Sequence, residues 1–156
     1  MSNLHRLQKE RLRHIAIIGV ASGIGAPDPG CGDGPGALEA IGLADKLRSA
    51  DRCVAWKTTI YPLEGSDKVA VVAECASRLA SFVSASMAAG DLPVVIGGDH
   101  SCAIGSWRGV AQALAGQPLG MLWIDAHLDS HTPDTKLARR DAHSATTATL
   151  SLPSSG

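Results

Sequence analysis

The sequence predicts an α/β domain in which helices cover both faces of a parallel sheet, a three-layer arrangement. Short β-branched segments alternate along the chain with longer segments whose apolar residues recur at helical spacing. Strands that alternate with helices form βαβ units, and a parallel sheet built from such units is buried on both sides. With 156 residues and 45% hydrophobic content, the chain is long enough for one domain with a substantial core.

The first half of the chain contains two expected strands and one expected helix. Residues 14–20 are a β-branched run, which favours a buried strand. Residues 21–36 are dense in Gly and Pro, so we expect a long loop without regular structure there. Apolar residues at nearly helical spacing predict a helix over residues 35–49, with Pro35 in its first turn. A second strand is expected at residues 53–61.

The longest expected helix covers residues 66–89, which are rich in Ala and Val. Either Ser66 or Asp67 can cap its first turn, and Gly90 can end it. The apolar run at residues 92–96 then predicts a third strand.

A further helix is expected at residues 101–114, followed by a fourth strand at residues 119–124. Beyond these elements the apolar periodicity is lost, and Ser and Thr become frequent. We therefore divide the chain into an α/β unit at residues 1–135 and a divergent tail at residues 136–156, which we expect to be disordered.

Composition points to a small-molecule partner. The formal net charge is −1, from 14 basic and 15 acidic residues, which predicts neither a nucleic-acid partner nor a membrane partner. The apolar stretch at residues 69–89 is interrupted by Glu74 and Arg78, which argues against a membrane span. The four cysteines form no CxxC pair, so we expect reduced thiols and a cytoplasmic protein.

Two polar motifs directly follow expected strands. Asp125, His127 and Asp129 occupy alternate positions after the fourth strand, so an extended chain places the three side chains on one face. His100 lies in the sequence Gly-Gly-Asp-His-Ser after the third strand, with Asp99 before it. Open parallel sheets bind ligands at the carboxyl ends of their strands, where both motifs fall.

These side chains suit a divalent metal centre. Carboxylates combined with imidazoles favour a six-coordinate ion such as Mn²⁺ over zinc, which prefers tetrahedral sites and thiolates. Two such ions could lower the pKa of a water toward about 7 and so support hydrolysis at neutral pH. Two interpretations without a metal stay open. Asp99 could simply cap the next helix, and the chain could be a generic α/β binding domain in which the motifs are coincidental.

The Gly-Gly-Asp-His-Ser turn and the Asp-Ala-His-Leu-Asp-Ser-His-Thr-Pro-Asp-Thr segment resemble the ureohydrolase superfamily, and within it the arginases, especially bacterial ones. The resemblance covers residues 14–135 and implies a truncated fold of the arginase/deacetylase type. It also implies that His100 and Asp129 bind one manganese ion, that His127 binds a second, and that Asp125 bridges the two. Asp125 and His127 would then be the catalytic residues, acting through the metal-activated water.

The same resemblance bears on the substrate and the partners. Arginases commonly have Asn or His at the position of His131, where it holds the amino acid end of the substrate. This favours hydrolysis of L-arginine to L-ornithine and urea, with agmatine or another guanidino compound as the alternative substrate. Arginases commonly form trimers or hexamers, so the resemblance also implies a homo-oligomer.

The chain departs from the arginase pattern after Thr135. Ala138 and Ala142 stand at positions that usually carry Ser and His, and His143 comes one place late. A later strand with two aspartate ligands and a substrate-binding glutamate has no counterpart, so four of six expected metal ligands are present. We therefore expect a catalytically incomplete fragment, or alternatively a non-catalytic module that associates with full-length subunits.

The resemblance also bears on the fourth strand. In the family this strand lies between strands that the chain lacks, so residues 119–124 would lose both hydrogen-bonding neighbours. Exposed apolar strand edges promote aggregation, and we expect low solubility unless a partner covers them.

Overall fold

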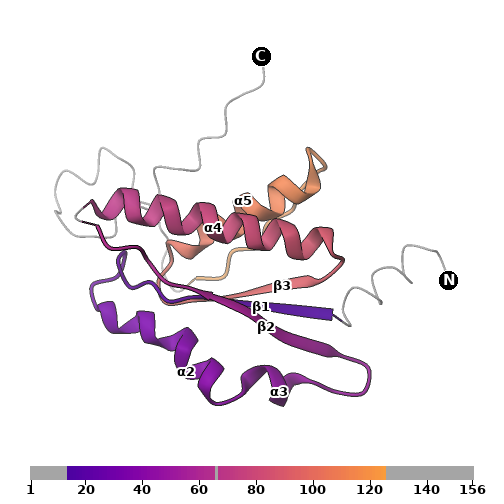
Figure 1. Cartoon of the computed structure of the whole chain (residues 1–156). Coiled ribbons are helices and arrows are strands. Elements are labelled where there is room, and N and C mark those ends of the chain that lie inside the picture. Colours follow the sequence, from indigo (N-terminus) through magenta and orange to yellow (C-terminus); the bar gives the residue numbers. More distant parts are fainter. Residues whose placement is uncertain (1–13, 66, 126–156) are drawn as a thin grey trace.

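A three-stranded parallel sheet with helices on both faces forms the framework of the molecule (Figure 1). The computed structural model describes residues 14–65 and 67–125. The strand order is β2-β1-β3, so β1 (His14–Val20) is central and pairs in parallel with β2 (Cys53–Ile60) and β3 (Leu92–Gly97). This architecture confirms the predicted fold class and matches the three strands expected before residue 100.

The main core lies between the sheet and α4 (Lys68–Ala88). The central strand is buried from Ala16 to Val20, as expected for a strand with neighbours on both edges and helices on both faces. The core cluster contains residues of β1, β2 and α4: Ile18, Val20, Ile60, Cys75, Leu79 and Val83. Figure 1 shows α4 and α5 (Cys102–Leu114) on one side of the sheet. Two short helices from residues 34–47 lie on the other side.

Helix α4 begins and ends as its sequence predicts. The Asp67 carboxylate accepts hydrogen bonds from the backbone N–H groups of Val69 (2.9 Å) and Ala70 (3.3 Å), so Asp67 is the N-cap. Gly90 follows the helix with a φ of 84°, a conformation that glycine adopts without strain. By length and composition alone α4 could cross a membrane, but core helices of soluble proteins pass the same test.

The single helix predicted at residues 35–49 is wrong, because two short helices occupy this segment. They are α2 (Gly34–Ala40) and α3 (Leu43–Leu47), and Gly42 between them has a φ of 71°. This left-handed residue breaks the helix, although the apolar spacing continues across it. The preceding Gly- and Pro-rich loop also contains a short 3-10 helix, η1 (Pro29–Asp33), where no regular structure was expected.

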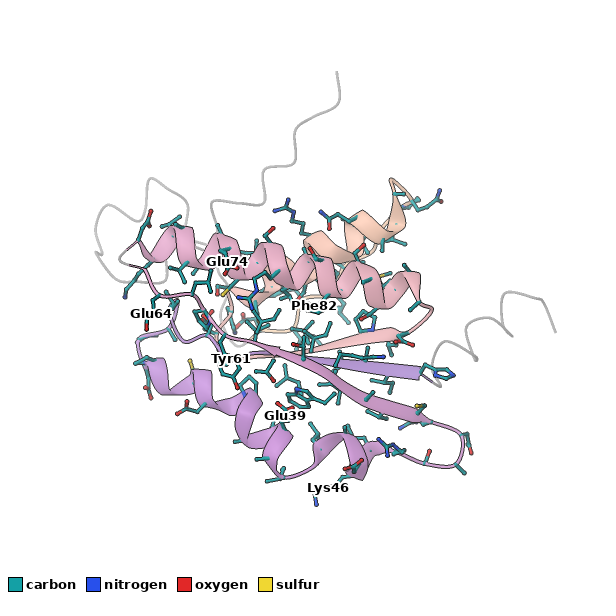
Figure 2. All side chains as sticks on the ribbon, viewed as in Figure 1. Glu39, Lys46, Tyr61, Glu64, Glu74 and Phe82 are labelled. Atoms are coloured by element: carbon teal, nitrogen blue, oxygen red, sulfur yellow. The ribbon has the colours of Figure 1, made fainter. Side chains whose placement is uncertain are left out.

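On the face of the sheet opposite α4, side-chain hydrogen bonds connect α2 to strand β2. Glu39 on α2 lies next to β2 (Figure 2), and its carboxylate accepts a hydrogen bond of 2.7 Å from Thr59 Oγ1. Thr59 Oγ1 in turn accepts a 2.9 Å hydrogen bond from Trp56 Nε1. Lys46 on α3, in contrast, points away from the sheet (Figure 2).

The fourth strand predicted at residues 119–124 does not form. This segment has no regular secondary structure, and Leu122 and Ile124 are 81% and 89% exposed. A strand needs a neighbour to satisfy its backbone hydrogen bonds, and no described strand pairs with this segment. The predicted tail at residues 136–156 lies outside the described residues.

Candidate metal centre

His100 occupies the turn that joins β3 to α5. The strand ends at Gly97 and the helix begins at Cys102, with Ser101 at its N-cap position. His100 therefore lies at the carboxyl end of the parallel sheet, as predicted, where such sheets bind their ligands.

Gly98 allows the loop after β1 to approach this turn closely. A Cβ atom added at Gly98 would lie 2.8 Å from both the carbonyl oxygen of Cys31 and the Cα of Gly32. Real Cβ atoms essentially never come within 3.0 Å of such atoms, so a larger residue would push the loop away. The glycine of the motif thus serves close backbone packing.

The side chain of Asp99 connects the turn after β3 to the Gly-rich loop after β1 through hydrogen bonds. Its Oδ1 accepts a 2.8 Å hydrogen bond from the N–H of Ser101, and its Oδ2 accepts bonds from Gly25 N–H (3.1 Å) and Ser22 Oγ (3.2 Å). The interpretation of Asp99 as the cap of the next helix is wrong, because Ser101 is the N-cap residue of α5 and Asp99 bonds to the backbone of Ser101 instead. The long-range bonds to Ser22 and Gly25 were not expected, because a serine and a glycine in a Gly-rich loop carry no distinctive signal.

His100 and Asp125 meet at the carboxyl end of β3. The distance from His100 Nδ1 to Asp125 Oδ2 is 3.5 Å, and the Asp125 side chain is 6% exposed whereas that of His100 is 65% exposed. Because Asp125 follows the segment that returns from α5, the structure brings together residues from both sequence motifs. An imidazole and a nearly buried carboxylate thus share one site.

Trp123 completes this group, and the sequence motifs did not predict it. Its Nε1 donates a 3.3 Å hydrogen bond to Asp125 Oδ2. Its ring lies edge-on to the imidazole of His100, with ring centroids 6.4 Å apart and planes at 90°. The indole therefore contacts both candidate ligands.

The chemistry of this pair fits part of a manganese site. A carboxylate oxygen and an imidazole nitrogen are suitable ligands for Mn²⁺, and their separation allows both to face one ion. Within residues 14–65 and 67–125, however, no group of three or more His, Cys, Asp or Glu side chains could hold a metal. The other predicted site residues, His127, Asp129 and His131, lie outside the described part of the chain.

The cysteines near the site remain thiols at neutral pH. Burial, and then the negative charge of Asp99, raises the pKa of Cys102 to about 11. Desolvation is also the main cause that raises the pKa values of Cys31 and Cys75. Deprotonation of these thiols is therefore less favourable than that of an exposed cysteine.

Two hollows lie beside the Gly-rich loop, and neither includes the candidate ligands. Their volumes are about 260 and 390 Å³. Gly23 and Pro29 line both, Tyr61 closes the smaller one and Lys68 borders the larger one.

Comparison of the sequence with known proteins identifies the family to which this chain belongs. The sequence model of the arginase family matches residues 13–151. Among curated proteins, the arginase of Agrobacterium fabrum is 37% identical over 142 residues, which are 84% of this chain and 44% of that protein. The arginase of Brevibacillus brevis is 32% identical over 131 residues, or 79% of this chain and 43% of that protein. Arginase-1 of Homo sapiens is 34% identical over the same share of this chain.

The three-dimensional comparison agrees. The crystal structure of the arginase from Bacillus subtilis matches with a TM-score of 0.57 at 28% sequence identity, covering 64% of this chain and 34% of that structure. The chain therefore belongs to the arginase family, and its sheet and helices are part of that fold. It spans less than half the length of the curated arginases that it matches.

Proposed function

We propose that this chain carries the first part of a manganese-dependent site that hydrolyses L-arginine to L-ornithine and urea. The carrying observation is the meeting of His100 with Asp125 at the carboxyl end of β3, in a chain of the arginase family. In the reaction, the oxygen of water bonds to the guanidinium carbon, and the bond from that carbon to the side-chain nitrogen breaks. The two products are urea and the amine of ornithine.

Two manganese ions, when bound, would supply the Lewis acidity that makes water nucleophilic at neutral pH. His100, Asp125, His127 and Asp129 would hold them, and Asp125 and His127 would flank the reacting water. Trp123 would orient the Asp125 carboxylate through its 3.3 Å hydrogen bond. His131 would hold the amino acid end of the substrate. These four side chains by themselves leave part of the charge of two divalent ions unbalanced, so metal binding through them should be weak and turnover slow.

A second candidate function is that of an interaction module, which would dock onto other arginase-type chains. The exposed apolar segment at residues 119–124 favours it, because large exposed apolar patches often mark binding surfaces. The cytoplasm is the proposed compartment, supported by the four free cysteines.

Urea release by the purified chain after loading with Mn²⁺ tests the catalytic proposal. L-Arginine should give slow release, with less from agmatine and guanidinobutyrate, and Asp125→Ala should abolish it. Asp91→Ala is the matched control, since Asp91 pairs with Lys57 (3.3 Å) away from the site. Release that is equal in the Asp125→Ala protein, or faster with agmatine than with arginine, would contradict the proposal.

A further inference from the structure

A buried hydrogen-bond network connects the loop after β1 to the turn that carries His100. Asp99, which is 9% exposed, accepts three hydrogen bonds through its two carboxylate oxygens. Two of the donors, Ser22 Oγ and the N–H of Gly25, belong to the loop, and the third, the N–H of Ser101, belongs to the turn. Within the part of the chain that the structure describes, no lysine or arginine pairs with Asp99. The carboxylate therefore depends on these three donors, because desolvation of an unpaired charge is costly.

Ser22 is the less obvious member of this network. It is 3% exposed, and its Oγ donates a 3.2 Å hydrogen bond to Asp99 Oδ2. The same oxygen accepts a 3.4 Å hydrogen bond from the N–H of Ile24, so the hydroxyl connects the backbone of the loop to the carboxylate. A backbone hydrogen bond of 3.1 Å from Gly98 N–H to the carbonyl of Val20 joins the same two segments at the end of β1. Loop and turn are thus held against each other at two levels.

The position of His100 depends on this network because its own side chain is mostly exposed. Its neighbours along the chain, Asp99 and Ser101, are both buried. The 2.8 Å hydrogen bond from Ser101 N–H to Asp99 Oδ1 closes the turn directly around His100. From this turn the imidazole approaches Asp125 Oδ2 to 3.5 Å. A shift of the turn would therefore move the imidazole away from the carboxylate with which it shares the site.

We propose that Ser22 and Asp99 are positioning residues of the candidate metal centre, and that they hold the imidazole of His100 where it can share a divalent cation with Asp125. They act through the backbone of the turn and do not bind the ion themselves. Residues outside the ligand set orient metal ligands in this way in many metalloproteins. The loop after β1 thereby becomes part of the metal centre. This inference rests on the proposed function, since it concerns ligands of the same centre.

Hydrogen exchange in the metal-free, wild-type chain gives a first test that needs no variant. The amides of Gly25 and Ser101 donate to a buried carboxylate, whereas the amide of Gly30 donates to an exposed one. The first two amides should therefore exchange at least about tenfold more slowly than the third. Equal exchange of all three would overturn the inference, because the network would then not hold the turn.

A variant of the loop separates positioning from general stability. Ser22→Ala removes one donor to Asp99 and leaves every candidate ligand in place. Val54→Ala is the matched control, because Val54 is fully buried at the amino end of the sheet, and its truncation destabilises the chain far from the turn. In the metal-free proteins, nuclear Overhauser contacts between the rings of His100 and Trp123 should weaken in Ser22→Ala and stay unchanged in Val54→Ala.

The affinity for Mn²⁺, measured from the electron paramagnetic resonance signal of the free ion, is the second readout of the same variants. Ser22→Ala should raise the Kd about tenfold, and Val54→Ala should leave it unchanged. Ring contacts or a Kd that stay the same in Ser22→Ala, or that change equally in both variants, would overturn the inference. If wild type binds no Mn²⁺ while the ring contacts respond to Ser22→Ala alone, the positioning of His100 stands and the proposed function is contradicted instead.

Discussion

Asp99 joins two segments that are far apart in the sequence. Its partners Gly25 and Ser22 lie 74 and 77 residues before it, and all three hydrogen bonds use its two carboxylate oxygens. Because the bond to Ser101 lies next to His100, Asp99 also fixes the turn that presents the candidate ligand. The closeness of Asp99 to the loop depends on Gly98, whose position tolerates no side chain.

Replacing Asp99 with asparagine should therefore destabilise the chain. The amide retains one acceptor oxygen, so one of the two N–H donors, of Gly25 or Ser101, would face an NH₂ group. We expect the free energy of unfolding to fall by about 1 to 3 kcal/mol, measured by urea denaturation.

Asp28→Asn is the control for that experiment. Asp28 accepts a local, exposed hydrogen bond of 2.8 Å from Gly30 N–H. Its replacement should change the stability by less than about 0.5 kcal/mol. Equal losses in the two variants would contradict the role assigned to Asp99.

At the scale of elements, the packing of α5 on α4 depends on two glycines. Gly105 and Gly109 are buried in α5, four residues apart on one side of the helix. Cβ atoms added there would each lie 2.6 Å from a backbone oxygen of α4, that of Ala76 or Ala80. The two backbones therefore approach closely without any intervening side chain.

Gly105→Ala should separate the two helices and lower the free energy of unfolding by about 1 to 3 kcal/mol. Gly36→Ala is the matched control on α2, where an added Cβ meets nothing within 4 Å. The control should stabilise the chain by about 0.5 kcal/mol, because alanine favours the helix. Calorimetric melting of both proteins checks this, and a stabilised Gly105→Ala protein would show that the interface is loose.

Local sequence signals predicted most elements because each carries its own start, stop and periodicity. Helix α4 has Asp67 as its cap and Gly90 after its end, and the strands are apolar runs between polar turns. The break at Gly42 was missed because apolar spacing continues across it. Residues 119–124 were misassigned because an apolar run predicts a strand, whereas the pairing that makes one depends on a neighbour elsewhere in the fold.

For the candidate site, too, the residues within local motifs could be predicted, whereas contacts between distant loops could not. His100 and Asp125 were identified from their motifs, and their 3.5 Å contact places both at the carboxyl end of β3. The contacts of Trp123 and Ser22 were not predictable, since they arise when separate loops meet. Predictions for His127, Asp129 and His131 stay predictions.

At the scale of the whole molecule, the chain belongs to the arginase family, and its described residues form a three-stranded sheet with β3 at one edge. The helices protect the core, but β3 and residues 119–124 leave apolar surface in water. The candidate ligands His100 and Asp125 lie at the carboxyl end of β3, close to that surface.

Paramagnetic relaxation by Mn²⁺ tests the central claim, that His100 and Asp125 form part of a metal centre, without requiring turnover. Small additions of Mn²⁺ should broaden the imidazole signals of His100, assigned through a His100→Gln variant, and leave those of His14 unchanged. His14 begins β1 and therefore lies at the opposite end of the parallel sheet. The broadening should be lost in Asp125→Ala. Equal broadening of His14 and His100, or broadening that persists in Asp125→Ala, would contradict a metal centre at this position.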